Sequence, residues 1–95
     1  MSTVIWLPEA VADLERLFLF LKDKSLTAAQ RAARLIQSGA NILKDQPQMG
    51  RLMEDNTNRR ELFLPFGSSA YVLRYKLDGE IVVIIRVWHG KEVRS

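Results

Sequence analysis

The chain has 95 residues and a net charge of +3, and 47% of its residues are hydrophobic. This length suits one domain spanning residues 1–95, and the hydrophobic content argues against intrinsic disorder. The sequence holds no cysteine, which excludes disulfides and thiolate metal sites. The mild positive charge is compatible with either a nucleic acid or an acidic protein as a partner.

No feature of the sequence predicts export or membrane insertion. The first four residues lack the basic region and the long apolar stretch of a signal peptide. No apolar run approaches the roughly 20 residues of a membrane span. We therefore expect a cytoplasmic protein that does not interact with membranes.

The first quarter of the chain predicts a short strand and a helix. Residues 3–7 are rich in β-formers, and Pro8 suits the first turn of a helix. Apolar residues keep helical spacing over residues 10–22. Leu19 and Phe20 fall outside this apolar stripe. They either widen the buried face or form a hydrophobic patch for a partner.

A second helix is predicted after a break at residues 23–26. Thr27 and Gln30 have the capping-box pattern, and apolar spacing continues to about Lys44. Residues 46–50, which include a proline and a glycine, stop this helix.

The second half predicts strands. We expect a polar loop over residues 51–58 and a strand over residues 60–66, in which Pro65 indicates a sheet edge. Asp78-Gly79 between two β-rich runs predicts a hairpin of residues 70–77 and 80–89. The resulting order is β-α-α-β-β-β, an α+β fold with a helical hairpin packed on a small, mainly antiparallel sheet.

A two-residue turn at Asp78-Gly79 also fixes the pairing within the hairpin. It predicts that three pairs face the helices: Tyr71 with Arg86, Leu73 with Ile84, and Tyr75 with Val82. Leu77 and Trp88 would share this side. The opposite, open face would carry Val72, Arg74, Lys76, Ile81, Val83, Ile85, Val87 and His89. A slip of one residue would exchange the two faces within one strand.

Few residues indicate catalytic chemistry. His89 is the sole histidine, so it is either a general acid or base or a structural hydrogen-bonding residue. A group of arginines could converge on phosphates or could simply be solvated: Arg51, Arg59, Arg60, Arg74, Arg86 and Arg94. No pattern of metal ligands is present, and neither a metal nor another cofactor is expected.

Several short motifs occur in a characteristic order along nearly the whole chain. They are Trp6 with Pro8, Ala10 and Asp13-Leu14; Ala32, Ile36 and Leu43; Pro47 and Gly50-Arg51; Arg60-Glu61-Leu62; Tyr71-Val72-Leu73-Arg74-Tyr75; and Arg86-Val87-Trp88-His89-Gly90. With these motifs the sequence resembles the RelE/ParE superfamily of toxins from type II toxin–antitoxin systems. The resemblance implies the same β-α-α-β-β-β fold.

The resemblance also implies a protein partner. Toxins of this superfamily bind a cognate antitoxin whose C-terminal segment wraps around them as helix and strand. On this chain the apolar open face and the first helix are the expected antitoxin-binding surfaces. The residues expected there are Leu19, Phe20, Arg74, Ile81, Val83 and Ile85.

The superfamily divides by target, and the resemblance leaves two classes open. ParE-like members poison DNA gyrase, whereas RelE-like members cleave mRNA in the ribosome. Val72 stands near a position where the RelE pattern has an arginine, and the long helical hairpin is more ParE-like. We therefore expect a gyrase poison. Its expected target-binding residues are Arg51, Arg60, Trp88 and His89.

The sequence is compatible with two functions other than gyrase poisoning. In a ribosome-dependent endoribonuclease, His89 would be the general acid and Arg60, Arg74 or Arg86 would stabilise the transition state. An inactive homologue would retain antitoxin binding alone.

Overall fold

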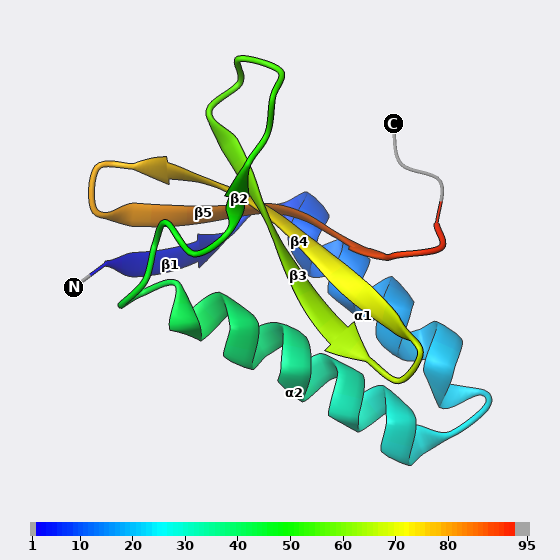
Figure 1. Cartoon of the computed structure of the whole chain (residues 1–95). Coiled ribbons are helices and arrows are strands. Elements are labelled where there is room, and N and C mark those ends of the chain that lie inside the picture. Colours follow the sequence, from blue (N-terminus) through cyan, green and yellow to red (C-terminus); the bar gives the residue numbers. More distant parts are fainter. Residues whose placement is uncertain (1, 93–95) are drawn as a thin grey trace.

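The computed structural model describes residues 2–92 and confirms the predicted α+β fold (Figure 1). The elements are β1 (Thr3–Trp6), α1 (Pro8–Lys22), α2 (Leu26–Ile42), β2 (Arg51–Leu52), β3 (Arg59–Phe66), β4 (Ser69–Asp78) and β5 (Ile81–His89). The predicted loop over residues 51–58 is wrong at its start, because the first two residues form the short strand β2.

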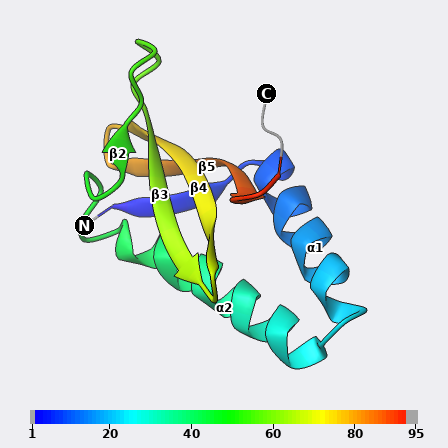
Figure 2. The ribbon, with the colours of Figure 1, turned by 45° about the vertical axis from the view of Figure 1, so that its right-hand side comes forward.

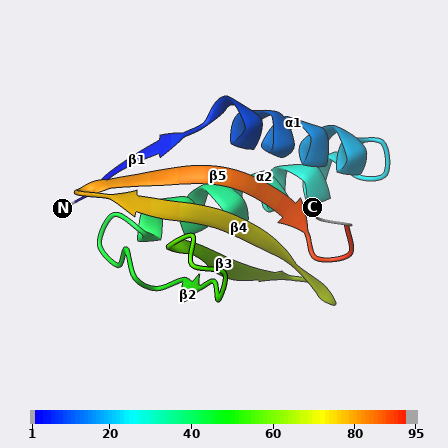
Figure 3. The same ribbon diagram turned by 90° about the horizontal axis from the view of Figure 1, so that it is seen from above.

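The five strands form one mixed sheet in the order β1-β5-β4-β3-β2 (Figure 3). Only β1 and β5 pair in parallel, so the sheet is mainly antiparallel, as predicted. β2 pairs with β3 only at Arg60 and Glu61. The following part of β3 is therefore a free edge, which explains why Pro65, which lacks an N–H, is tolerated there.

The two helices form an antiparallel pair joined by a short turn (Figure 2). α1 packs beside β5, whereas α2 packs against β3 and β4. α2 begins at Leu26, and the Ser25 side chain accepts a hydrogen bond from the Ala28 N–H. The helix cap is therefore Ser25 and not Thr27, because only Ser25 has the extended backbone that an N-cap requires.

The core lies between the helices and one face of the sheet. Its fully buried large side chains include Ile36, Leu43, Tyr71, Leu73, Tyr75, Val82, Ile84 and Val87. Gly39 lets α2 approach the sheet closely, since a Cβ at this position would lie 2.7 Å from Leu64 Cδ1. Neither helix within residues 2–92 is long and apolar enough to cross a membrane.

The register of the β4–β5 hairpin differs from the prediction. Asp78 pairs with Ile81, so the two turn residues are Gly79 and Glu80 rather than Asp78 and Gly79. The observed pairs are Tyr71 with His89, Leu73 with Val87, and Tyr75 with Ile84. The predicted partners Arg86, Ile84 and Val82 are therefore wrong.

A β-bulge accounts for the second part of this difference. Tyr75 pairs with Ile84 but Arg74 pairs with Arg86, which leaves Ile85 as the extra residue of β5. An extra residue exchanges the two faces for the rest of the strand. As a result Arg86 and Trp88 lie on the open face, and Val87 and His89 lie on the helix side, the reverse of the prediction.

Candidate functional site

The open face of the sheet carries an arginine–tryptophan–arginine stack. The Arg74 guanidinium carbon lies 4.6 Å from the Trp88 ring centroid, and that of Arg86 lies 5.2 Å from it. Cations at such distances are attracted by the negative face of an indole ring. Trp88 is only 5% exposed, although it lies outside the core between helices and sheet. The bulge at Ile85 creates this stack by turning Arg86 and Trp88 to the open face.

Both arginines of the stack also bind carboxylates. Arg74 Nε and Nη2 donate to Glu61 Oε2 at 3.1 and 2.9 Å. Arg86 Nε donates to Asp13 Oδ2 at 2.7 Å, and its Nη2 donates to Asp13 Oδ1 at 3.1 Å. The hydrogen bonds from Arg86 to Asp13 raise the pKa of the guanidinium. The two cations therefore have partners within the protein.

Asp13 is the polar link between α1 and β5. It is 4% exposed and accepts a further hydrogen bond from the Val87 N–H at 2.9 Å. Asp13 also forms an ion pair with Arg16, and Arg16 in turn pairs with Glu92. Burial opposes ionisation of Asp13, but the hydrogen bonds from Arg86, Val87 and Arg16 outweigh it, so the pKa of this carboxyl lies below its ordinary value.

His89 lies on the other side of the sheet from this stack. Its ring makes an edge contact with Tyr71 at a centroid distance of 5.4 Å, and Nδ1 accepts a hydrogen bond from the Lys91 N–H at 3.2 Å. The His89 N–H donates to Glu92 Oε1 at 2.8 Å. These contacts order the end of β5.

A mostly apolar cavity of about 510 Å³ adjoins His89, between α1 and the ends of β3 to β5. Its lining comprises Arg16, Leu17, Phe20, Leu21, Phe66, Tyr71, His89, Lys91 and Glu92. Burial, followed by the nearby Glu92 charge, raises the pKa of Tyr71. The cavity offers apolar contact area with a polar rim.

Arg60 holds the loop that leads from α2 to β2. Its Nη1 donates to the carbonyls of Gln48 and Gly50 at 3.2 and 2.8 Å. The Tyr75 hydroxyl supports the same loop, since it donates to the Pro47 carbonyl and accepts from the Gly50 N–H, both at 2.8 Å. Burial raises the pKa of Tyr75 against the effects of the Gly50 N–H and Arg60. Arg60 therefore closes a loop in this structure.

The four residues considered for ribonuclease catalysis do not meet at one point. Arg60 pairs with Tyr75 and His89 pairs with Tyr71. These partners stand four residues apart on β4, which separates Arg60 and His89 by about 13 Å along the strand. Arg74 and Arg86 lie together on the opposite face.

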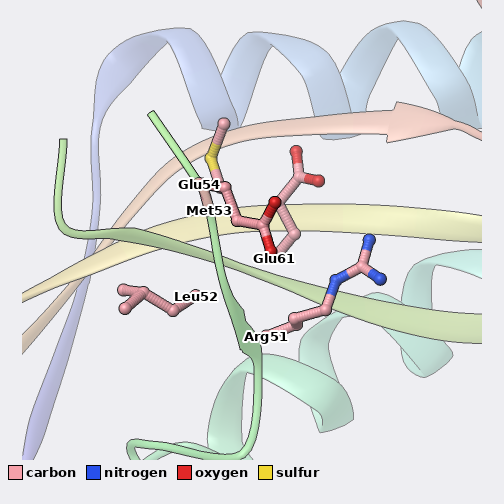
Figure 4. A pocket seen from close by; sticks show the side chains of 5 residues that line it. All are labelled: Arg51, Leu52, Met53, Glu54 and Glu61. Atoms are coloured by element: carbon pink, nitrogen blue, oxygen red, sulfur yellow. The ribbon is translucent and has the colours of Figure 1, made fainter. Parts of the chain in front are cut away.

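Arg51 lies in a separate hollow at the edge of the sheet, with a volume of about 300 Å³ (Figure 4). Its lining is formed by Arg51, Leu52, Met53, Glu54 and Glu61. In Figure 4 the side chains of Arg51 and Leu52 point away from each other, as expected for neighbours on a strand. The Arg51 guanidinium carbon lies 5.7 Å from the Phe63 ring centroid. Arg51 pairs with Glu61, and Glu61 pairs with Arg74. Arg51 therefore lies in the same row of the sheet as the stack and not in the row of His89.

Arg59, another member of the predicted phosphate-binding group, is bound to a carboxylate of a nearby loop. This carboxylate belongs to Asp55, in the loop that follows β2. Arg94 lies outside the described residues. No group of histidine and carboxylate side chains within residues 2–92 could hold a metal ion.

The residues predicted to bind an antitoxin lie in two places. Leu19 and Phe20 are 49% and 63% exposed on α1. Ile81 is partly exposed and Val83 is buried at the start of β5, whereas Ile85 is the bulged residue and Arg74 belongs to the stack. Sequence reasoning missed Asp13 and Glu61 as partners of the two arginines. A carboxylate beside the apolar stripe of α1 was the available signal for Asp13.

The family assignment follows from comparison with known proteins. Residues 4–94 match the model of the ParE toxin of the type II toxin–antitoxin system parDE. The chain belongs to this family. It is 39% identical over 92 residues to Toxin RelE1 of Caulobacter vibrioides, covering 97% of each chain. It is also 39% identical over 87 residues to Toxin RelE3 of the same organism, covering 92% of each.

Solved structures share the fold of this toxin. A chain of the chromosomal ParDE system from P. aeruginosa superimposes with a TM-score of 0.77 at 20% identity, covering 96% of this chain and 98% of that chain. A chain of the E. coli RelBE toxin–antitoxin complex gives a TM-score of 0.62 at 16% identity, covering 99% and 100%. The predicted membership of the RelE/ParE superfamily is confirmed.

Proposed function

We propose that this toxin inhibits growth by binding and poisoning DNA gyrase, and that a cognate antitoxin neutralises it. The observation that carries the proposal is the separation of the candidate catalytic groups. General acid catalysis at a phosphate requires the acid and the stabilising cations within hydrogen-bonding reach of one reacting group. Here Arg60 and His89 pair with positions four residues apart on β4, and Arg74 and Arg86 lie on the other face.

The partners of the arginines also favour a binding mechanism. Arg74 and Arg86 bind Glu61 and Asp13, and Arg60 binds two backbone carbonyls. A phosphate would have to displace these interactions before the guanidinium groups could stabilise its developing charge. A protein partner could instead contact Arg86, whose side chain is 39% exposed, without breaking these pairs.

The exposed apolar residues of α1 support an antitoxin as the controlling partner. The two solved neighbours come from systems named ParDE and RelBE, the latter in an intact toxin–antitoxin complex. On this chain Leu19 and Phe20 are exposed, and Phe20 also lines the cavity beside His89. An amphipathic helix that places its apolar residues against this surface would bury them.

Ribosome-dependent mRNA cleavage is the second candidate. The names of three Caulobacter relatives, RelE1, RelE2 and RelE3, favour it, at 34–39% identity. His89 also shares its cavity with Arg16 and Lys91, two cations that a phosphate could contact. In this reaction the 2′-hydroxyl attacks the adjacent phosphate and an acid protonates the leaving oxygen.

A gyrase supercoiling assay with purified, antitoxin-free protein tests the proposal. We expect lost supercoiling and trapped cleaved DNA at concentrations near that of gyrase. His89→Ala should change this inhibition by no more than about tenfold, the effect of one ordinary interface contact. A folded protein that spares gyrase but cleaves ribosome-bound mRNA would refute the proposal. His89→Ala should then lower cleavage by roughly 10²–10⁴-fold.

A further inference from the structure

Two arginines on α2 differ from the others in the described part of the chain. Six of the eight arginines within residues 2–92 contact a carboxylate, a carbonyl or an aromatic ring through their side chains: Arg16, Arg51, Arg59, Arg60, Arg74 and Arg86. Arg31 and Arg34 make no such contact in this part of the chain, and both are exposed. Their charges are available to a partner.

The surroundings of these two arginines favour an anion. α2 contains no Asp, no Glu and no aromatic residue. Its exposed side chains at helical spacing are Thr27, Gln30, Arg31, Arg34, Gln37, Ser38 and Asn41. These residues provide hydrogen-bond donors along one helix face without a negative charge to repel a polyanion. We call this surface the α2 polar face.

A groove of about 380 Å³ runs along the α2 polar face. Arg31, Arg34 and Ser38 contribute to one wall, and residues 65–67, at the turn between β3 and β4, form the other. Residues three apart on a helix are neighbours on its surface, so the two guanidinium groups can reach the same or adjacent anionic groups. Arginine donates two parallel hydrogen bonds to phosphate oxygens, which suits this arrangement.

We propose that the α2 polar face binds the phosphate backbone of double-stranded DNA. Leu35, Pro65 and Phe66 also line this groove, but every exposed residue of α2 from position 27 to 41 is polar. The exposed apolar anchors that a protein segment needs lie on α1, at Leu19 and Phe20. A single strand would need several aromatic residues on which successive bases stack, whereas Phe66 alone among the described lining residues of this groove is aromatic. The choice of DNA over RNA rests on the proposed function, because gyrase acts on duplex DNA.

The test measures binding of the toxin alone to a fluorescent DNA duplex of about 20 base pairs, by anisotropy at several salt concentrations. The variant Arg31→Gln/Arg34→Gln should bind at least tenfold more weakly at low salt. Its plot of log K against log salt should be less steep by about 2, since about one unit is lost for each phosphate contact removed. The control Lys22→Gln/Lys76→Gln removes the same charge from exposed positions on α1 and β4. It should bind within about twofold of the parent protein.

Three results would overturn the proposal. The folded parent protein could fail to bind the duplex at low salt. Both variants could weaken binding equally, which would indicate general attraction by net charge. An RNA duplex of equal length could bind more tightly than DNA. Circular dichroism verifies folding of each variant, and glutamine is a good helix former at these sites. Because gyrase is absent, failure here is distinct from failure of the supercoiling assay.

Discussion

The outer surfaces of α1 and α2 differ in chemistry although the two helices pack together. α1 exposes Leu19 and Phe20, whose burial would stabilise a complex with a protein segment. α2 exposes Arg31 and Arg34 among uncharged polar residues, a surface suited to phosphates. This difference predicts that the two neighbouring helices bind separate partners, α1 through apolar contacts and α2 through charge.

The helices also differ in how they are attached to the sheet. Asp13 ties α1 to β5 through charged hydrogen bonds to Arg86 and a further bond to the Val87 N–H. α2 is held by close apolar packing, in which Gly39 lies against Leu64. The polar attachment of α1 depends on ionisation, whereas the packing of α2 does not.

The largest effect is expected from removing the polar attachment. Asp13→Ala leaves Arg86 without its buried partner and the Val87 N–H without an acceptor. We expect a loss of about 3 kcal/mol in the free energy of unfolding, the lower end for a broken buried ion pair because Arg86 remains partly exposed. Urea unfolding monitored by tryptophan fluorescence measures this loss. Glu15→Ala, at an exposed position on the same helix, is the control and should cost less than about 0.5 kcal/mol.

The pH dependence of stability provides an independent measurement on the same attachment. The pKa of Asp13 in the folded protein lies below its ordinary value of 3.8. Its ionised form is therefore stabilised by folding, and this contribution is complete above pH 3.8 and lost as the pH falls through the folded value. The stability difference between the parent protein and Asp13→Asn should shrink over this acidic range. A constant difference would contradict the assigned role.

The next effect concerns the exposed residues of α1. Leu19→Ala/Phe20→Ala should weaken binding of the cognate antitoxin by about 2 kcal/mol, or roughly 30-fold, if these residues are central to the interface. Calorimetry with the purified antitoxin measures this change. Arg31→Gln/Arg34→Gln is the matched control on α2 and should leave antitoxin affinity nearly unchanged. Equal losses in both variants would show that the two helix surfaces serve one partner.

The order of elements could be predicted from local patterns, but the hairpin register could not. Apolar spacing and turn residues identified both helices and the long strands. The glycine in Asp78-Gly79-Glu80 supports a turn at either adjacent pair of positions, and the observed turn is one residue later. The bulge at Ile85 is followed directly by Arg86 and Val87, both bound to Asp13. A contact with a residue more than seventy positions away leaves no local signal.

The contacts of the candidate site could not be predicted either, because they also join residues that are distant in the sequence. The sequence indicated that arginines and His89 were of interest, but it gave no means of deciding which arginines had partners. Glu61 lies opposite Arg74 on the neighbouring strand, and this pairing depends on the register of β3 and β4. Nothing in the sequence singled out Arg31 and Arg34, because a charged residue on an exposed helix face is ordinary. Their lack of side-chain partners within residues 2–92 emerges only from the contacts of the folded chain.

The smallest effect distinguishes the observed start of α2 from the predicted one. Ser25→Ala removes the acceptor for the Ala28 N–H and should cost about 1 kcal/mol, or about 4–8 °C in the melting temperature. Thr27→Ala removes the hydroxyl that the capping-box pattern had selected, and it should change stability by only a few tenths of a kcal/mol. Thermal unfolding of both variants tests this. The reverse order would place the helix cap at Thr27 and would shorten α2 by two residues. Arg31 and Arg34 would then lie nearer the positive end of the helix, where a phosphate is stabilised by the helix dipole as well as by the side chains.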